Sequence, residues 1–387
     1  MEDWKEYKLK DVAYLTSGFP FDGHKYGKDG VRVVRGDNVT IGSLRWDSEK
    51  DKRWSEPFER ASEYSLMADD IVIGMDGSRV GKNRAQVKAS DLPLLLAQRV
   101  ACVRHNELSI QSFLYYQIFN DKFEKYIKAV QTGTSIPHVS LKQIGDYPIM
   151  LPPLAVQYKF SDILKSLDDK IEVNRRINEN LEQQAQALFK SWFVDFDPFK
   201  DQPFVESELG MIPKGWKVVS LGDLIEIRYG KDHKKLLDGE IPVYGSGGLM
   251  RKVDKALYTG ESVLIPRKGT LNNVMYVNEA FWTVDTMFYS IPKVENIMLF
   301  TFIYLSNRDL ASLNAGSAVP SMTTEILNNM KVVLPNLAIL EDFNNRAEAL
   351  YNLIKHNEDE SRRLAELRDT LLPRLMSGEI KVNEVNV

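Results

Sequence analysis

The chain has 387 residues, of which 43% are hydrophobic and 27% are charged, the balance of a folded protein with room for two or three domains. Its single cysteine, Cys102, excludes an intramolecular disulfide and a multi-cysteine metal site, and its five histidines show no ligand spacing. Because the first residues are charged and every apolar stretch is far shorter than a membrane span, we expect a cytoplasmic protein without a signal peptide.

The formal net charge of −4 is unevenly distributed along the chain. Residues 1–151 and 210–333 are slightly basic, whereas residues 152–209 and 334–387 are acidic. Alternation of this kind is typical of segments that bind different partners, but differences this small carry little weight alone.

Two blocks of the sequence, residues 10–150 and 220–333, carry short apolar runs between glycine-rich turns. Runs of this kind are typical of strands, and residues 110–129 add the pattern of a helix to the first block. We therefore expect two mixed α/β domains, each with a curved, mostly antiparallel sheet. The clearest strand-like runs are residues 31–34, 70–73, 241–244 and 262–265.

Two segments without glycine, residues 157–193 and 340–376, predict long helices, and their only proline, Pro373, lies near the end of the second. Both segments repeat apolar residues at heptad spacing, which is typical of helices that pack as a coiled coil. The two heptad series are Leu164, Leu167, Ile171, Asn174, Asn178, Leu181, Ala185, Leu188 and Trp192, and Ala347, Leu350, Ile354, Asn357, Ser361, Leu364, Arg368, Leu371 and Leu375.

The middle of each heptad series is polar, at Asn174 and Asn178 in the first and at Asn357 and Ser361 in the second. A buried asparagine reduces stability but can fix the register of two helices. Solvated interruptions of two ordinary core helices are the alternative. We favour the register role because both helices are interrupted at the same place.

The sequence contains an internal repeat. Gly133-Thr-Ser-Ile-Pro137 returns as Gly316-Ser-Ala-Val-Pro320. At the same separation Leu151-Pro-Pro-Leu-Ala155 returns as Leu334-Pro-Asn-Leu-Ala338, and the register then continues through both predicted helices. The starts of the two blocks also match, at a second constant separation, with Trp4, Leu9 and Gly18 corresponding to Trp216, Leu221 and Gly230.

Catalytic signatures are absent from the sequence. A DNA adenine methyltransferase needs an Asn/Asp-Pro-Pro-aromatic loop, and the nearest string, Asp197-Pro-Phe-Lys200, lacks the second proline. Gly77-Ser-Arg-Val-Gly-Lys82 has the wrong glycine spacing for a nucleotide-binding P-loop, and Asn83 stands where a magnesium-binding Ser or Thr is required. We expect this loop to contact DNA phosphate instead of ATP.

Several longer strings resemble the specificity subunit of type I restriction–modification enzymes. Residues 208–223, 241–248 and 265–270 resemble one of its target-recognition domains, residues 187–198 the end of its central conserved helix, and residues 367–380 its C-terminal helix. Nothing like Glu-Leu-Gly-x-Ile-Pro precedes Trp4, so the first domain departs further from the family pattern.

The resemblance implies an α+β chain in which two target-recognition domains are separated by two long antiparallel helices. Each recognition domain would read one half of a bipartite, asymmetric DNA site, while the helices set the unread spacer. The predicted recognition domains are residues 1–151 and 210–333, and the helical regions are residues 152–209 and 334–387.

The resemblance also implies partners and no catalysis by the chain itself. Two methyltransferase subunits would dock on the helical regions and carry S-adenosylmethionine and the adenine-N6 chemistry. Two motor-nuclease subunits would join with ATP and Mg²⁺. The alternatives are a non-enzymatic scaffold that spaces two protein-binding domains, and the specificity module of a fused nuclease–methyltransferase.

Candidate DNA-contacting residues are basic or polar side chains at predicted strand ends and in loops with glycine. Taken singly, each can equally be a solvated surface residue. In the first domain they are Arg35, Asn38, Arg79, Lys82, Gln98 and Arg99. In the second domain they are Lys231, Lys234 and Lys235 of a basic loop, with Tyr244, Ser246, Arg267 and Lys268 of the family-like strings.

Two further sets of residues have two interpretations each. Thr134, Ser135, Ser317 and Ser321 flank the repeated Gly-x-x-x-Pro turn and could contact DNA, or the turn could merely close each domain against its helix. The aromatic run Trp192, Phe193, Phe196 and Phe199 could dock a subunit, but we favour packing against the start of the second domain.

Overall fold

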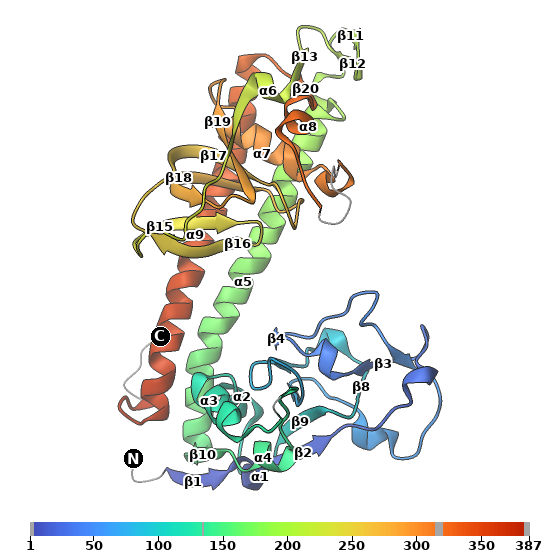
Figure 1. Ribbon diagram of the computed structural model, residues 1–387, viewed down its shortest axis with the longest axis vertical. Helices are drawn as coiled ribbons and strands as arrows, with labels where there is room; N and C mark the ends of the chain where they lie inside the picture. The colour runs from blue at the N-terminus through green and yellow to red at the C-terminus, as the bar shows by residue number, and fades with distance from the viewer. Residues whose placement is uncertain (1–3, 134, 314–319, 383–387) are drawn as a thin grey trace. The chain divides into compact units, whose positions relative to one another are not determined.

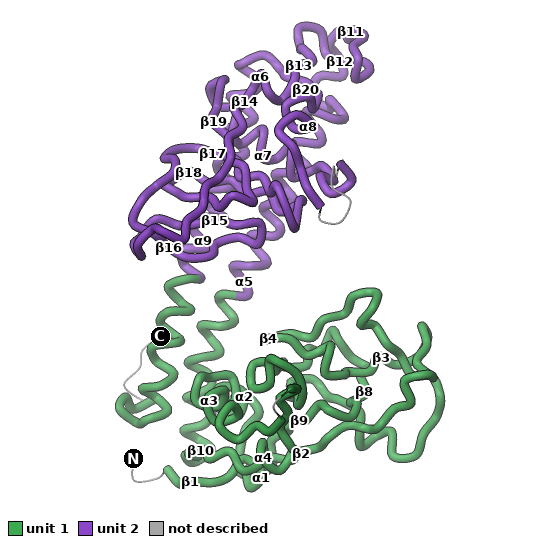
Figure 2. Tube along the Cα trace, viewed as in Figure 1, with its two compact units in different colours: residues 1–171, 362–387 green, residues 172–361 purple. Residues whose placement is uncertain are grey.

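The structure is a computed structural model that describes residues 4–133, 135–313 and 320–382. Residue contacts divide the chain into two compact units (Figure 2). Among the described residues, no helix combines the length and the apolar character that crossing a membrane requires. The first unit is residues 1–171 with 362–387, and the second unit is residues 172–361.

The first unit contains short strands arranged in three sheets (Figure 1). Its strands are β1 (Lys5–Lys8), β2 (Ala13–Ser17), β3 (Val31–Val34), β4 (Ile41–Gly42), β5 (Arg53–Trp54), β6 (Ile71–Gly74), β7 (Arg84–Gln86), β8 (Leu94–Leu96), β9 (Val100–His105) and β10 (Pro148–Leu151). The largest sheet has the order β2-β9-β6-β7-β4, a second has the order β5-β3-β8, and β1 pairs with β10.

Short helices complete the first unit: α1 (Leu9–Val12), α2 (Gln111–Ile118), α3 (Asp121–Val130) and α4 (Leu141–Gly145). The single helix predicted over residues 110–129 is therefore two helices. They are separated at Asn120, whose side chain accepts a hydrogen bond from the Phe123 N–H at 3.0 Å and so caps α3. Asparagine is a preferred N-cap residue because it supplies this acceptor. Apolar periodicity alone does not reveal such a break.

The second unit also has three sheets, and several of its strands are longer. Its strands are β11 (Phe204–Ser207), β12 (Gly210–Pro213), β13 (Lys217–Ser220), β14 (Ile225–Tyr229), β15 (Ile241–Gly245), β16 (Gly248–Val253), β17 (Tyr258–Pro266), β18 (Met275–Thr283), β19 (Met287–Pro292) and β20 (Lys331–Leu334). The largest sheet has the order β14-β19-β17-β18-β15-β16, while β13 pairs with β20 and β11 with β12. The short helices are α6 (Leu221–Leu224), α7 (Met298–Ser306) and α8 (Thr324–Asn328).

Some strand pairings are the same in the two units. In the first unit β2 pairs with β9 and β9 with β6, and in the second unit β14 pairs with β19 and β19 with β17, all antiparallel. The sheets are mixed, since β3 runs parallel to β8 and β15 runs parallel to β18. These parallel pairs bring the ends of β3 and β15 beside the loops that carry most of the candidate residues.

The aromatic run at the end of the first long helix is part of the core of the second unit. Phe193 and Phe199 are buried, and their rings lie 5.7 Å and 5.0 Å from the Trp216 ring. Phe193 also packs edge-on against Phe343 at 4.8 Å. Burial of aromatic side chains contributes strongly to stability. The packing interpretation is therefore confirmed for this run.

The two long helices are α5 (Leu154–Phe193) and α9 (Leu337–Met376), and each contributes residues to both units. Their apolar heptad residues are buried or partly buried within each unit taken by itself. In the first unit Leu164 and Leu167 share a core with Leu371 and Leu375. In the second unit Ala185 shares a core with Ala347.

The polar middle of the heptads forms a hydrogen-bonded layer inside the second unit. Asn174 Nδ2 donates to Glu360 Oε2 at 2.7 Å, and Asn357 Nδ2 donates to Asn178 Oδ1 at 2.8 Å. From the first contact to the second, the residue number increases along α5 and decreases along α9, so the two helices are antiparallel. Asn174 and Asn357 are buried and are not solvated interruptions. Their role in fixing register stays a prediction, as does that of Asn178 and Ser361.

Candidate nucleic-acid interface

In both units the strand ends that carry candidate residues are joined by the same backbone hydrogen bonds. Gly18 N–H donates to Val100 O at 3.2 Å, and Phe19 N–H donates to Leu96 O at 2.9 Å. In the second unit Gly230 N–H donates to Met287 O at 2.9 Å, and Lys231 N–H donates to Thr283 O at 2.8 Å. These bonds tie the first strand of each sheet to the turn that precedes β9 or β19.

The same turn also receives the end of the parallel strand. Ala97 N–H donates to Val34 O at 3.0 Å, just as Val284 N–H donates to Tyr244 O at 3.1 Å. The loop that follows β6 in the first unit and β17 in the second unit also hydrogen-bonds to this turn. Met75 N–H donates to Arg99 O at 3.0 Å, and Arg267 N–H donates to Thr286 O at 2.8 Å.

The repeated Gly-x-x-x-Pro turn closes this arrangement in each unit. Gly77 N–H donates to Pro137 O at 2.9 Å, and Gly269 N–H donates to Pro320 O at 3.4 Å. We call the joined segments the first and second platform. The first platform is residues 18–19, 34–36, 75–79, 97–100 and 137–139, and the second is residues 230–231, 244–246, 267–269, 283–287 and 320–322.

The repeated turn therefore joins the platform through Pro137 in the first unit and Pro320 in the second. Ser135 is exposed, and Ser321 forms a backbone bridge with Lys268. Thr134 and Ser317 lie outside the described residues. Whether these serines and threonines contact DNA stays a prediction.

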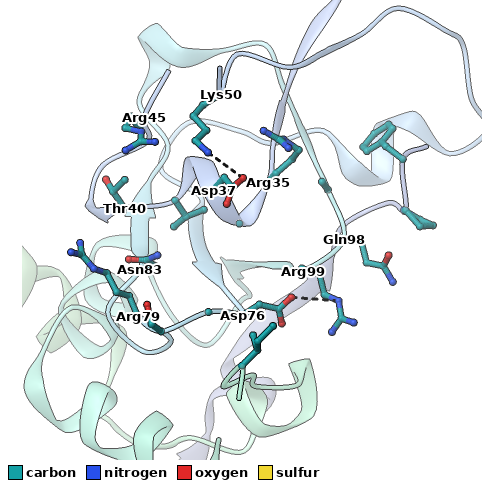
Figure 3. Close-up of a pocket in the computed structure, with 18 of the residues that line it drawn as sticks. Arg35, Asp37, Thr40, Arg45, Lys50, Asp76, Arg79, Asn83, Gln98 and Arg99 are labelled. Carbon is teal, nitrogen blue, oxygen red and sulfur yellow. Dashed lines mark hydrogen bonds and ion pairs between the residues drawn. The ribbon is translucent and has the colours of Figure 1, made fainter. Parts of the chain in front are cut away.

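The first platform borders an open cavity of about 630 Å³ (Figure 3). Four candidate residues from separate parts of the sequence line it, namely Arg35, Arg79, Gln98 and Arg99. Sequence reasoning missed further polar residues of the lining, namely Thr40, Arg45, Lys50 and Asn83. Arg45 and Lys50 lie eleven and sixteen residues beyond the predicted strand at residues 31–34, so the strand-end rule did not identify them.

Basic side chains outnumber acidic ones around the cavity. Its four arginines and one lysine share the lining with two carboxylates, those of Asp37 and Asp76. Arg45 also pairs with Asp47, which is not part of the lining, at 3.0 Å. Lys50 Nζ lies 3.4 Å from Asp37 Oδ2, and Arg99 Nε lies 3.6 Å from Asp76 Oδ2. The remaining positive charge favours an anionic ligand such as the DNA backbone.

Arg35 is partly buried at the cavity wall. Its guanidinium lies over the Tyr26 ring at 5.7 Å from the ring centroid, a cation–π contact that orients a planar donor group. Burial raises the pKa of the Tyr26 hydroxyl, while the Arg35 charge opposes the shift. Among the described residues, Arg35 Nε is buried and has no hydrogen-bond partner.

Asn38 is a correction to the candidate set, because the structure places its side chain inside the loop. Asn38 is fully buried. Its Nδ2 donates to Lys50 O at 2.9 Å and to Arg45 O at 3.1 Å, and its Oδ1 accepts from Arg35 N–H. Asn38 therefore holds the loop that presents Arg35, Arg45 and Lys50, and its own side chain is inaccessible to DNA.

Lys82 is exposed but is not part of the cavity lining. Its Nζ lies 3.7 Å from Glu124 Oε1. A hydrogen bond from Lys128, with a further contribution from the Lys82 charge, lowers the pKa of the Glu124 carboxyl. Lys82 is thus directed toward α3, and its contact with DNA stays a prediction.

The second platform brings most of its candidate residues to one turn, residues 283–287. Arg267 Nη1 donates to Asp285 O at 3.3 Å, and its guanidinium lies 5.2 Å from the Tyr229 ring centroid. The Tyr244 hydroxyl donates to Glu279 Oε1 at 3.1 Å, and Ser246 O accepts from Asn273 Nδ2 at 2.8 Å. Lys231, Lys234, Lys235 and Lys268 are exposed.

Both platforms carry side chains that are suited to recognition. Arginine, lysine, glutamine, asparagine and tyrosine can hydrogen-bond to base edges and phosphates. Within residues 4–133, 135–313 and 320–382, no group of three or more His, Cys, Asp or Glu side chains could hold a metal ion.

The fold defines a duplicated α+β protein built on two long helices, and comparisons with known proteins specify its family. The family model described as "Type I restriction modification DNA specificity domain" matches residues 1–183 and 213–368. The chain belongs to this family.

Relatives match the chain over almost its whole length. The type I restriction enzyme MjaIX specificity subunit of Methanocaldococcus jannaschii is 26% identical, with 99% of this chain and 95% of the relative covered. The HindI specificity subunit of Haemophilus influenzae is 24% identical, with 98% and 100% covered. The crystal structure of the type I restriction–modification S subunit from M. genitalium shares the fold, with a TM-score of 0.59, 16% identity and 96% of each chain covered.

Membership confirms the resemblance inferred from the sequence. It also confirms the interpretation of the chain as a DNA-specificity subunit that is not itself catalytic. The shared fold confirms the predicted class, two mixed α/β domains with two long antiparallel helices and an internal repeat.

Proposed function

We propose that each platform reads one half of a bipartite site in double-stranded DNA. The observation that carries this proposal is the construction of two equivalent platforms from matched backbone hydrogen bonds, each edged by basic and polar side chains. Their side chains differ, so the two half-sites differ in sequence and the whole site is asymmetric. The recognition domains in this proposal are residues 1–151 and 210–333.

The helical regions, residues 152–209 and 334–387, set the unread spacer and dock two methyltransferase subunits. An internal pseudo-twofold repeat supports this proposal, because it offers two similar surfaces to two identical partners. In the assembled complex the methyltransferase subunits carry S-adenosylmethionine and the adenine-N6 chemistry. Two motor-nuclease subunits bring ATP and Mg²⁺, and the complex acts in the cytoplasm.

The test compares the purified chain with the chain co-purified with its methyltransferase subunits. The chain alone is expected neither to bind S-adenosylmethionine nor to methylate DNA, and the complex is expected to do both. Methyl transfer by the chain alone would contradict the proposal.

A second measurement separates DNA reading from a scaffold that spaces two protein-binding domains. The complex is expected to bind a bipartite duplex at a salt concentration that removes non-specific binding. A duplex with one scrambled half-site is the control, and equal binding of both duplexes would favour the scaffold.

A further inference from the structure

Arg99 and Asp76 form an exposed cation–anion pair at the edge of the first platform (Figure 3). Arg99 Nε lies 3.6 Å from Asp76 Oδ2, and the two side chains are 61% and 34% exposed. This distance exceeds that of an N–H···O hydrogen bond. Both groups therefore keep hydrogen-bonding capacity for a ligand that enters the cavity.

The backbone fixes both members of the pair. Arg99 has a φ of 73°, in the left-handed region that is unfavourable for a residue with a side chain. Its carbonyl oxygen accepts from Met75 N–H, which holds this conformation. Asp76 forms a backbone bridge with His138, which follows the repeated turn. Strained, well-supported positions of this kind are concentrated at functional sites.

Asp76 is an unusual group to place on a surface for a polyanion. A carboxylate repels phosphate, and its proximity to Arg99 weakens the cation that would attract phosphate. Phosphate binding therefore gives no reason for Asp76 to occupy this position, whereas the hydrogen-bonding pattern of a base pair does.

We propose that Arg99 and Asp76 together read one G·C base pair in the major groove. Arginine donates to guanine O6 and N7, and a carboxylate accepts from the amino group on cytosine N4. Guanine O6 and cytosine N4 are hydrogen-bonded to each other, so they lie about 3 Å apart. The 3.6 Å separation of Arg99 and Asp76 matches that spacing, so one pair of side chains reads both edges.

Arg99 and Asp76 together also specify the orientation of the base pair. A C·G pair presents the donor and the acceptors in exchanged places, and an A·T pair presents a different pattern. This inference rests on the proposed function, since it assigns one position within the half-site of the first domain. It identifies Asp76 as a specificity-determining residue that the sequence did not single out.

The experiment uses the complex of the full chain with its methyltransferase subunits and maps methylated motifs by sequencing genomic DNA. Arg99→Ala and the isosteric Asp76→Asn are each compared with the unmodified chain. Both are expected to relax the same base pair, a G·C pair in the half-site of the first domain, by about tenfold or more. Arg99→Lys loses the planar fork but can still donate to guanine O6 and N7, so it is expected to relax the position less than Arg99→Ala.

Glu63→Gln is the matched control, because Glu63 pairs with Arg60 on the exposed surface of the same unit and does not line the cavity. It is expected to leave the motif unchanged. The proposal would be overturned if the Arg99 and Asp76 variants relaxed two different positions, or a position other than G·C. It would also be overturned if they lost methylation equally at all motifs. If the unmodified complex produced no bipartite motif, the proposed function itself would fail.

Discussion

The two platforms share a backbone and differ in side chains. The backbone bond that Phe19 makes in the first platform is made by Lys231 in the second, and the bond that Val34 makes is made by Tyr244. The backbone hydrogen bonds at these positions are the same in both platforms and therefore do not depend on the side chain. Specificity can therefore change by substitution of side chains while the fold of each unit is preserved.

Charge is placed differently on the two platforms. In the first, Asp76 and Arg79 lie on the loop after β6 and Arg99 lies on the turn. In the second, Arg267 and Lys268 lie on the loop after β17 and Asp285 lies on the turn. Matched surfaces with different charges are suited to different base sequences, because cations and carboxylates contact opposite kinds of base edge.

The largest expected effect comes from breaking each platform at its matched glycine. A Cβ at Gly18 would overlap the backbone of Ala97, and a Cβ at Gly230 would overlap the Val284 carbonyl. Gly18→Val and Gly230→Val are each expected to destabilise their own unit by about 2–3 kcal/mol, through overpacking, and to abolish methylation. Thermal unfolding and methylation assays measure both effects.

Gly23→Ala and Gly247→Ala are the matched controls, because a Cβ at either position meets open space. They are expected to behave like the unmodified chain. If Gly18→Val methylated normally while Gly230→Val did not, the two platforms would not be equivalent in construction.

A second prediction changes the helices and leaves both platforms intact. A helical residue adds about 1.5 Å and 100°, and a base pair adds about 3.4 Å and 35°. Four residues inserted in both helices, near Asn178 and Ser361, add about 6 Å and a residual 40°. Two base pairs add about 7 Å and 70°, so we expect a spacer longer by about two base pairs.

A seven-residue insertion is the comparison for this prediction. It preserves the heptad seam but adds about 10 Å with almost no net rotation, whereas three base pairs require about 100°. We expect the four-residue insertion to be better tolerated and both half-sites to stay unchanged. An original spacer at full activity would show that the helices do not set the distance.

The smallest expected effects come from single side chains. Arg267→Ala in the second unit and Arg79→Ala in the first are each expected to weaken methylation. A base contact would cost about 1–3 kcal/mol and relax one position in one half-site, whereas a phosphate contact would weaken all sites alike. Competition binding with duplexes substituted at single positions measures the difference. Unchanged binding by both variants would remove these residues from the interface.

Much of the fold could be predicted from the sequence because its signals are local or repeated. The heptads predicted both long helices, and the repeat predicted two similar domains. The break at Asn120 escaped prediction because the helical pattern runs across it, and the cap depends on one hydrogen bond. The parallel pairing of β3 with β8 also escaped, since it joins segments far apart in sequence.

The candidate site was only partly predictable. Side-chain type and loop position identified Arg35, Arg79, Gln98 and Arg99, and the structure brings them to one cavity. The same rule selected Asn38, whose buried position depends on loop contacts that no sequence pattern shows. The same rule did not select Asp76, because the sequence does not show that this acid in a basic loop lies beside Arg99.

The most direct test of the division of labour is an exchange of residues 216–333 for the corresponding block of a relative that recognises a different site. Sequencing of the methylated genome before and after the exchange reports both half-sites. The account predicts that one half-site changes to that of the relative while the other half-site stays the same. A change in both half-sites, or in neither, would contradict the claim that each platform reads one half.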